Sequence, residues 1–322
     1  MEVALFGAAG YAGLELAKLL ATHPHVKLAC VASDTHAGKP VGELTGRDHG
    51  PLTFVTTDEA RTIAARCGLA LLAVPPEPAK LLAAPLREAG CKVIDLSHAH
   101  RGAPGAVYGL TSLFSDEIRN ASLIANPGCY ATAVIIACAP LVRYGLVDGL
   151  FAVSAGSGVT GAGRTGADDM SLGEMYGEVR AYKVLRHQHV PEIETSLARC
   201  GTVSRVVLTT HLLPVARGIF ATVTAQLASP IASDALVQRF RADYSGDPTV
   251  VIARTPEEVS LRRVVGTYAC MLGVATDERG ALVVTVALDN LLKGAASQAI
   301  ENLNVMLGVS RTAGLEHLAR HA

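Results

Sequence analysis

The stretch Asn126-Pro127-Gly128-Cys129-Tyr130 places a cysteine, the residue type best suited to covalent chemistry, directly after a tight turn. An apolar run (122–125) precedes it and an apolar, helix-prone segment (131–141) follows, which predicts a strand end, a turn and a helix start. A thiol in the first turn of a helix faces unpaired N–H groups and the positive end of the macrodipole, and both stabilise the nucleophilic thiolate. Most free cysteines are instead small buried hydrophobes. The turn by itself does not decide whether Cys129 is a nucleophile or a buried core residue.

Two histidines spaced two residues apart, His187 and His189, are followed by Glu192. An imidazole oriented by a nearby carboxylate is suited to general acid–base catalysis. Surface histidines also occur at this spacing by chance, so the pair indicates catalysis only if a nucleophile lies nearby.

Two further segments could bind an anion. Residues 156–164 form a glycine-rich run that ends in Arg164, and main-chain N–H groups with a guanidinium suit a phosphate or carboxylate. A flexible linker is the alternative for this run. Arg217 lies in a turn between two apolar segments and is a second candidate anion ligand.

The N-terminal segment has the pattern of a dinucleotide-binding unit. An apolar strand (3–6) runs into Gly7, Gly10 and Gly13, and a helix is expected over 14–22. Glycines at such a turn let the main chain approach a pyrophosphate, whose charge then meets the helix N-terminus. The spacing is G-x-x-G-x-x-G, and a plain tight turn is the alternative.

The next strand (26–32) ends where a Rossmann domain binds the adenosine ribose. Asp34 at this point indicates a free 2′-hydroxyl and hence NAD, whereas Ser33 and Lys39 indicate a 2′-phosphate and hence NADP. The sequence leaves the choice of cofactor open.

Alternating helices and apolar strands continue to about residue 126, which predicts a parallel sheet. The expected elements are a helix over 57–65, a strand over 69–74 ending at Pro75, a helix over 79–88 and a strand over 92–96. In the second half strands predominate, which predicts an α+β domain with a mixed or antiparallel sheet. They are expected at 150–154, 205–210, 219–227, 250–253, 269–274 and 281–288. A last helix (294–308) starts with small residues that suit packing against the nucleotide-binding domain.

Composition excludes several classes of protein. Half of the 322 residues are hydrophobic, 18% are charged and the net charge is −1, so there is no electrostatic footprint for nucleic acid or an anionic membrane. No apolar stretch is long enough to span a bilayer, and the N-terminus lacks the pattern of a signal peptide. Seven cysteines, an odd number without close pairing, indicate a reducing cytosol and a cytoplasmic location. No cysteine–histidine group has the spacing of zinc ligands, and no metal is expected. The six cysteines other than Cys129 are expected to be core residues.

Five motifs occur in order along the chain: G-x-x-G-x-x-G, N-P-G-C-Y, S-G-x-T-G-A-G-R, H-x-H-x-P-E and D-N-L-x-K-G-A-A. Together they resemble the N-acetyl-γ-glutamyl-phosphate reductase family. These enzymes are acyl-phosphate reductases of arginine biosynthesis, related to aspartate-semialdehyde dehydrogenase and more distantly to glyceraldehyde-3-phosphate dehydrogenase. The resemblance covers essentially the whole chain.

The resemblance implies an α/β fold with two domains. One is an NADP-binding Rossmann domain (1–126, with the C-terminal helix 294–322), and the other is an α+β catalytic and oligomerisation domain (127–293). It also implies an NADP-dependent oxidoreductase, with NAD not excluded, that forms a homodimer or homotetramer. Two other functions stay open, namely reduction of the homologous aminoadipyl phosphate in lysine biosynthesis and a nicotinamide-binding regulator without turnover.

The resemblance further assigns residues to roles. Cys129 matches the nucleophile and His189 the general acid–base, with His187 and Glu192 beside it. The cofactor-binding positions are Gly7, Ala9, Gly10, Tyr11, Ala12, Gly13, Ser33, Lys39, Pro75, Asn290 and Lys293. The substrate-binding positions are Ser97, Arg101, Asn126, Ser157, Gly158, Arg164 and Arg217.

The chain departs from the family pattern at three places. After Ser97 the family usually continues A-D-F-R, whereas this chain has His98-Ala99-His100-Arg101. The family's Y-G-L-P-E is Y-G-L-T-S here, at 108–112, and Asp34 stands where an arginine is common. None of these departures involves the nucleophile.

Overall fold

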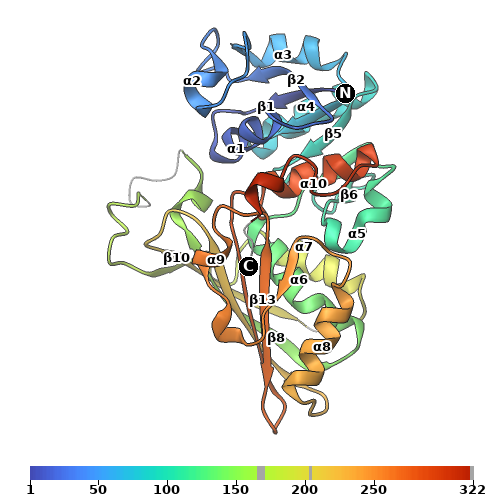
Figure 1. Ribbon diagram of the computed structural model, residues 1–322, viewed down its shortest axis with the longest axis vertical. Coiled ribbons are helices and arrows are strands. Elements are labelled where there is room, and N and C mark those ends of the chain that lie inside the picture. Colours follow the sequence, from blue (N-terminus) through green and yellow to red (C-terminus); the bar gives the residue numbers. More distant parts are fainter. Residues whose placement is uncertain (165–170, 203–204, 320–322) are drawn as a thin grey trace. The chain divides into compact units, whose positions relative to one another are not determined.

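The computed structural model describes residues 1–164, 171–202 and 205–319 (Figure 1). The chain forms two compact units. Unit 1 comprises residues 1–128 and 295–319, and unit 2 comprises residues 129–294. The chain therefore passes from one unit to the other immediately before Cys129 and again after Gly294.

Unit 1 is built on a parallel sheet of order β3-β2-β1-β4-β5-β7-β6. Every strand pair in it is parallel. Its strands are β1 (Glu2–Phe6), β2 (Lys27–Ala32), β3 (Phe54–Val55), β4 (Leu69–Leu72), β5 (Lys92–Asp95), β6 (Val107–Tyr108) and β7 (Leu123–Ala125). The helices are α1 (Tyr11–Leu20), α2 (Val41–Thr45), α3 (Thr57–Ala64), α4 (Pro76–Glu88), α5 (Thr111–Ile118) and α10 (Ala296–Leu307). The predicted α/β fold with a parallel sheet is confirmed.

The apolar runs of unit 1 form strands because both faces of a parallel sheet are covered. The residues of β4 and positions 3–6 of β1 are completely buried. Helix α1 begins at Tyr11, three residues before the predicted start, because Gly10 occupies its N-cap and Gly13 lies inside its first turn. Helix α4 begins at Pro76, also three residues early, because proline is well suited to the first helical position.

Unit 2 contains a mixed sheet of order β12-β13-β14-β11-β8-β10-β9, as predicted. Its strands are β8 (Val147–Gly158), β9 (Arg180–Tyr182), β10 (Val206–Leu213), β11 (Ile219–Leu227), β12 (Val250–Ile252), β13 (Cys270–Thr276) and β14 (Ala281–Leu288). The helices are α6 (Cys129–Arg143), α7 (Val190–Ala198), α8 (Ser233–Asp243) and α9 (Leu261–Val264). Neighbouring strands are antiparallel except for β8 with β10 and β12 with β13.

Helix α6 is the central helix of unit 2. All residues from Tyr130 to Val142 are buried, and the helix packs against β8, β11, β14 and α7. A helix that is apolar on every side must be enclosed by other elements. This enclosure gives Cys129, its first residue, a rigid base.

The glycine-rich run 156–164 differs from the predicted loop. Residues 156–158 are the end of β8 and pair with β10, residues 156 and 157 pair also with β11, and residues 159–162 form a 3₁₀ turn. Small residues are required there because a Cβ added at Gly158 would lie 2.7 Å from the main-chain nitrogen of Arg217. This part of the run is therefore regular structure and not a linker.

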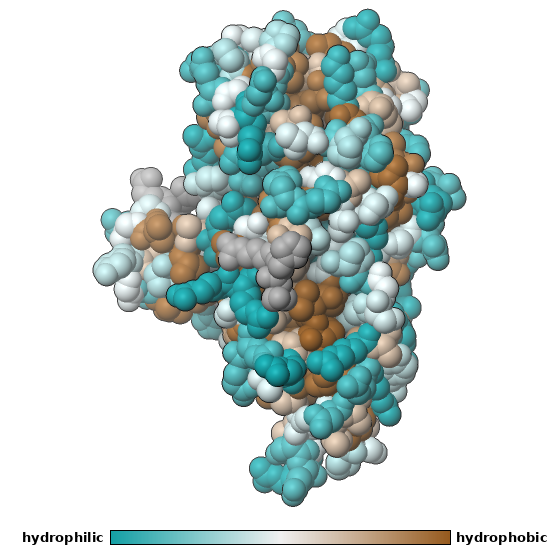
Figure 2. Space-filling view, in the orientation of Figure 1, coloured by the Kyte–Doolittle hydropathy of each residue, from teal (hydrophilic) through white to brown (hydrophobic). Residues whose placement is uncertain are grey.

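Unit 2 also carries an exposed apolar surface, formed by five large side chains within residues 171–185. Its large side chains are between 46% and 90% exposed. They are Leu172, Tyr176, Val179, Val184 and Leu185. Figure 2 shows brown, apolar surface on the lobe that the yellow-green part of the chain forms in Figure 1. Among the described residues, no helix is long and apolar enough to cross a membrane.

Candidate active site

Cys129 is the first residue of α6, as the sequence predicts, and is half-buried. Gly294 packs directly beside it, since a Cβ added at Gly294 would lie 2.7 Å from the Cys129 Cβ. The positive end of the α6 helix dipole favours the thiolate at this position.

The other cysteines lie in environments that disfavour the thiolate. Burial raises the pKa of Cys30 to about 12 and that of Cys91 to about 11, and it raises the pKa of Cys138 further. Cys67 and Cys270 are also buried. Cys200 was expected in the core but is only half-buried, and burial still raises its pKa.

The structure brings the histidine pair to the helix that carries the nucleophile. The ring centroid of Tyr130 lies 5.3 Å from that of His187 and 6.1 Å from that of His189. Glu192, on the first turn of α7, places its Oε1 atom 3.8 Å from His189 Nε2. All three of His187, His189 and Glu192 are less than a tenth exposed. The two histidines therefore pack against Tyr130, the residue that follows the cysteine in α6.

The two histidines differ in their environment. The main-chain N–H of His189 donates to His187 Nδ1 (3.2 Å), which places the proton of a neutral His187 imidazole on Nε2. Burial, and next the charge of Lys183, lower the pKa of His187 to about 4. His187 is thus neutral at pH 7 and holds the main chain of His189 in place.

The low pKa of His187 predicts a pH-dependent stability. Between pH 4 and 6.5 the unfolded chain binds a proton at this histidine and the folded chain does not, so the folded state loses stability as the pH falls through that window. For His187→Asn, whose side-chain oxygen can replace Nδ1 as the acceptor, we expect about 2–3 kcal/mol less destabilisation from pH 6.5 to 4.5 than for the wild type. Urea unfolding of both proteins at the two pH values measures the difference. An equal loss in both would contradict the assigned environment.

A pair of tyrosines that packs against the histidines was not predicted from the sequence. Tyr182 donates its hydroxyl hydrogen to the Tyr130 hydroxyl (3.0 Å), and Tyr130 donates to the main-chain oxygen of His211 (3.3 Å). Burial raises the pKa of Tyr182 to about 12 and that of Tyr130 further, so both are neutral. The adjacency of Tyr130 to Cys129 was the one available signal, because Tyr182 is linked to it only by tertiary structure.

The segment that leads from β9 to the histidines is conformationally strained. Lys183 and Leu185 have φ angles of 48° and 57°, in the left-handed region that costs a residue with a Cβ about 1 kcal/mol. Lys183 Nζ also donates to Gln188 Oε1 (2.7 Å). Such strain is often retained at functional sites, where the surrounding contacts enforce it.

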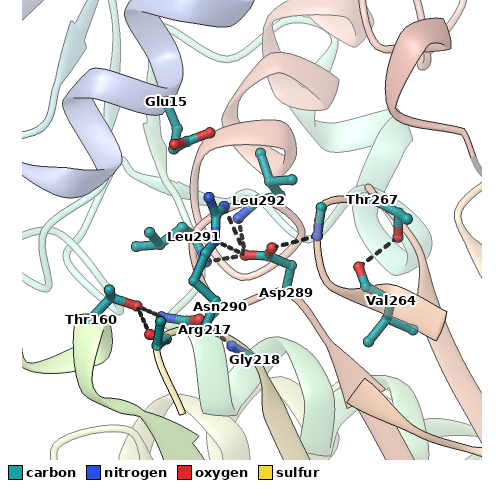
Figure 3. Close-up of polar contacts among 12 residues, drawn as sticks. Glu15, Thr160, Arg217, Gly218, Val264, Thr267, Asp289, Asn290, Leu291 and Leu292 are labelled. Atoms are coloured by element: carbon teal, nitrogen blue, oxygen red, sulfur yellow. Dashed lines mark hydrogen bonds and ion pairs between the residues drawn. The ribbon is translucent and has the colours of Figure 1, made fainter. Parts of the chain in front are cut away.

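Arg217, a predicted anion ligand, is bound to the buried carboxylate of Asp289 (Figure 3). The Arg217 Nη2 and Nε atoms lie 3.1 and 3.4 Å from Asp289 Oδ1. The same oxygen accepts from the main-chain N–H groups of Leu291 and Leu292, and Oδ2 accepts from Gly266. Asp289 therefore fixes the direction of the Arg217 side chain.

Removing the charge of Asp289 is expected to destabilise unit 2. In Asp289→Asn an N–H₂ donor replaces one acceptor oxygen, and a buried ion pair is broken, so we expect a loss of about 3 kcal/mol. Glu258→Gln is the control, because its partner Arg254 is 82% exposed and such pairs contribute at most about 1 kcal/mol. Urea unfolding measures both. A loss for Asp289→Asn no larger than for Glu258→Gln would contradict the role of Asp289.

The remaining predicted positions of unit 2 have different surroundings. Asn290 accepts from the Gly218 N–H (2.7 Å) and donates to Thr160 Oγ1 (3.1 Å). Lys293 is completely buried and donates to Thr249 Oγ1 (2.8 Å), which places its ammonium group inside unit 2. The buried Ser157 hydroxyl donates to the main-chain oxygen of Gly158, and Arg164 is exposed.

In unit 1 the glycine turn packs too closely on its own main chain to accept side chains at Gly7 and Gly13. Gly7 has a φ of +78°, and a Cβ there would lie 2.3 Å from the Ala73 oxygen. A Cβ at Gly13 would lie 2.3 Å from the Gly7 oxygen. Ala9, Tyr11 and Ala12 surround the N-terminus of α1, whose N-cap Gly10 has no side chain. A turn of main-chain atoms at a helix N-terminus fits a dinucleotide pyrophosphate.

The groups after β2 differ in their availability to a ribose. Both oxygens of Asp34 accept hydrogen bonds from Thr57, from its N–H at 2.7 Å and from its hydroxyl at 2.8 Å, and these bonds lower the pKa of Asp34. The Ser33 hydroxyl lies 3.2 Å from His36 Nδ1. Lys39 and Pro75, after β2 and β4, are exposed.

Ser97 and Arg101, which are predicted to bind substrate, make hydrogen bonds within unit 1. Ser97 donates to Asp95 Oδ2 (2.9 Å), and Arg101 donates to the main-chain oxygens of Asn126 and Leu96 (both 3.0 Å). His100, at a departure from the family pattern, lies 2.7 Å from the same Asp95 oxygen.

Comparison with known proteins assigns the chain to a family. Residues 2–121 match the family model described as semialdehyde dehydrogenase, NAD binding domain, and residues 129–290 match semialdehyde dehydrogenase, dimerisation domain. N-acetyl-γ-glutamyl-phosphate reductases from Picosynechococcus sp. and Geobacillus kaustophilus are 38% and 37% identical to it over 99% of this chain and 97% and 99% of theirs. The chain belongs to the N-acetyl-γ-glutamyl-phosphate reductase family. The predicted family is thereby confirmed, and with it a pyridine-nucleotide-binding domain.

Solved structures share the fold of this family member. Aspartate semialdehyde dehydrogenase II from Vibrio cholerae has a TM-score of 0.78 at 20% identity, covering 95% of this chain and 98% of that one. Aspartate semialdehyde dehydrogenase from Candida albicans, solved with NADP, has a TM-score of 0.74 at 15% identity over the same shares.

Proposed function

We propose that this protein reduces N-acetyl-γ-glutamyl phosphate to N-acetylglutamate 5-semialdehyde with NADPH, releasing phosphate, as a step of arginine biosynthesis. The observation that carries the proposal is the cysteine at the N-terminus of α6, whose neighbour Tyr130 packs against both histidines. The identity of the substrate is inferred from family membership.

The Cys129 thiolate attacks the acyl carbon, the carbon–oxygen bond to phosphate breaks, and phosphate leaves with the bonding electrons. This step leaves a thioester on Cys129. Bound NADPH would supply the hydride that reduces this thioester. N–H groups of the first turn of α6 stabilise the oxyanion of the tetrahedral species. The sulfur–carbon bond then breaks, which releases the semialdehyde and restores the thiolate.

His189 is the general acid–base in this scheme. It protonates the oxyanion and takes the proton back as the carbon–sulfur bond breaks, and the released phosphate takes up from solvent the proton that the overall reaction consumes. Glu192, 3.8 Å away, orients the imidazole. His187, with a pKa of about 4, positions His189 and transfers no proton at pH 7.

The cofactor is held by the glycine turn (Gly7, Gly10 and Gly13), and we propose NADPH over NADH. Both oxygens of Asp34 are engaged by Thr57, which leaves Ser33 and Lys39 to bind a 2′-phosphate. Asn290 and Lys293 act by holding the late segment of unit 2 in place.

Ser33→Ala tests this preference. Loss of one hydrogen bond to a charged phosphate is expected to raise KM for NADPH about 10-fold and to leave KM for NADH unchanged. Asp34→Asn is the control, because its side chain faces Thr57, and it is expected to change neither value by more than about 2-fold. Steady-state kinetics with both cofactors measure this. Equal effects of Ser33→Ala on both would contradict the assignment.

The protein is proposed to act as a homo-oligomer. The match of residues 129–290 to a dimerisation domain supports this, as does the exposed apolar surface of residues 171–185. Light scattering on the purified protein checks it, and a monomer at micromolar concentration would contradict it.

The reverse reaction tests the function. N-acetylglutamate semialdehyde, phosphate and NADP are expected to give NADPH, with NAD as a parallel assay, and omission of phosphate should stop turnover after the first cycle. Inactivity with this substrate but activity with the aminoadipyl homologue would assign the protein to lysine biosynthesis instead. Cofactor binding without turnover of either would indicate a regulator.

A further inference from the structure

Asn126 directly precedes the Pro127-Gly128 turn, and each of its main-chain and side-chain polar groups makes a hydrogen bond. Its main-chain N–H donates to the Asp95 oxygen (2.8 Å), and its main-chain oxygen accepts from Arg101 Nε (3.0 Å). Its side-chain Nδ2 donates to the Ala295 oxygen (3.2 Å), and its Oδ1 accepts from Asn302 Nδ2 (3.0 Å). The residue is 1% exposed. Its carboxamide therefore makes both of these hydrogen bonds inside unit 1, and its substrate-binding role stays a prediction.

Asn302, which lies on α10, is completely buried in a close-fitting site. A Cβ at Gly109 would lie 2.4 Å from Asn302 Nδ2, so the glycine makes room for this amide. One helical turn earlier, Gln298 Nε2 donates to the Gly109 oxygen (3.1 Å) and to Thr111 Oγ1 (3.0 Å). Two polar side chains of α10 therefore bind the segment around Gly109, and Asn302 alone of the two extends the network to Asn126.

We propose that Asn302 is a positioning residue for Cys129, a role that rests on the proposed thiol chemistry. It fixes the Asn126 carboxamide, from which only Pro127 and Gly128 separate the nucleophile. If Asn302 is replaced, Asn126 Oδ1 loses its hydrogen-bond donor. Since both residues are buried, no water can take the place of that donor without rearrangement. A displacement of about 1 Å at a reacting atom can reduce the rate about 100-fold. The hydrogen bond between Asn302 and Asn126 therefore affects the reactivity of Cys129 as well as the stability of the protein.

The same helix offers a matched control. Asn304 is also completely buried, and its Nδ2 donates to the main-chain oxygens of Arg311 and Ala313 (both 2.9 Å). Its Oδ1 lies 2.9 Å from His23 Nε2. These contacts fix the C-terminal segment of unit 1 and do not include the residues that precede Cys129.

The test compares Asn302→Asp with Asn304→Asp. In each, a carboxylate oxygen replaces an N–H₂ donor that faces an oxygen atom, so both variants are expected to lose stability. For Asn302→Asp we expect the rate of iodoacetamide alkylation of Cys129 to change at least about 5-fold, and kcat to fall about 10-fold or more at a KM within about 3-fold of wild type. For Asn304→Asp we expect both rates within about 2-fold of wild type. Peptide mapping identifies the alkylated thiol, and urea unfolding records stability.

Equal stability losses with unchanged alkylation and kcat in both variants would overturn the proposal, because Asn302 would then serve packing alone. If Asn302→Asp does not fold, Asn302→Ala and Asn304→Ala make the same comparison without adding charge. Alkylation is measured without substrate or cofactor. An altered alkylation rate in a protein that fails to reduce the acyl phosphate would therefore reject the proposed function and retain the positioning role.

Discussion

Replacing Cys129 by serine is expected to lower kcat at least about 10³-fold while the dissociation constant for NADPH stays within about 2-fold of wild type. A serine hydroxyl is too weak an acid for a helix N-terminus to ionise at neutral pH, so the covalent step is lost. The glycine turn that holds the cofactor is unaffected by the substitution.

Cys200→Ser is the control, because Cys200 is the other half-buried cysteine and lies at the end of α7. It is expected to keep near-normal turnover and the same cofactor affinity. Steady-state kinetics and fluorescence titration with NADPH measure both quantities. Near-normal turnover of Cys129→Ser would refute covalent catalysis at this residue.

Replacing His189 by asparagine is expected to lower kcat by about 10²–10⁴-fold. This imidazole lies beside Glu192 and against the Tyr130 ring, and we assign it the proton transfers to and from the oxyanion.

His187→Asn separates the roles of the two histidines. Its side-chain oxygen can still accept from the His189 N–H, so we expect a loss of no more than about 10-fold in kcat. The pH–rate profiles of the two variants and the wild type give the comparison. A larger loss in His187→Asn than in His189→Asn would reverse the assignment.

Much of the fold was predictable because local patterns determine it. Strands β11 and β14 have the predicted bounds, since long runs of alternating or continuous apolar residues leave little choice of structure. The two-residue strands β3 and β6 were not predicted, because their pairing depends on neighbours in space. Helices α7 and α8 were missed for a related reason, since only a few residues of each are buried.

The reactive and charged residues of the site were easier to predict than the residues that bind and orient them. Cys129 begins its helix as expected, because the turn before it is encoded by adjacent residues. Arg217 was predicted from its charge, but its partner Asp289 is 72 residues away in the sequence. Asn126 and Asn302 are 176 residues apart, and no local pattern could have joined them.

The position of Cys129 in a covalent pathway is tested most directly by trapping the acyl enzyme. The protein is mixed with N-acetylglutamate semialdehyde and NADP in the absence of phosphate, quenched in acid and digested for mass spectrometry. We predict one equivalent of NADPH per active site and an N-acetylglutamyl adduct on the peptide that contains Cys129. NADPH formed without an adduct, or an adduct on another residue, would contradict the mechanism.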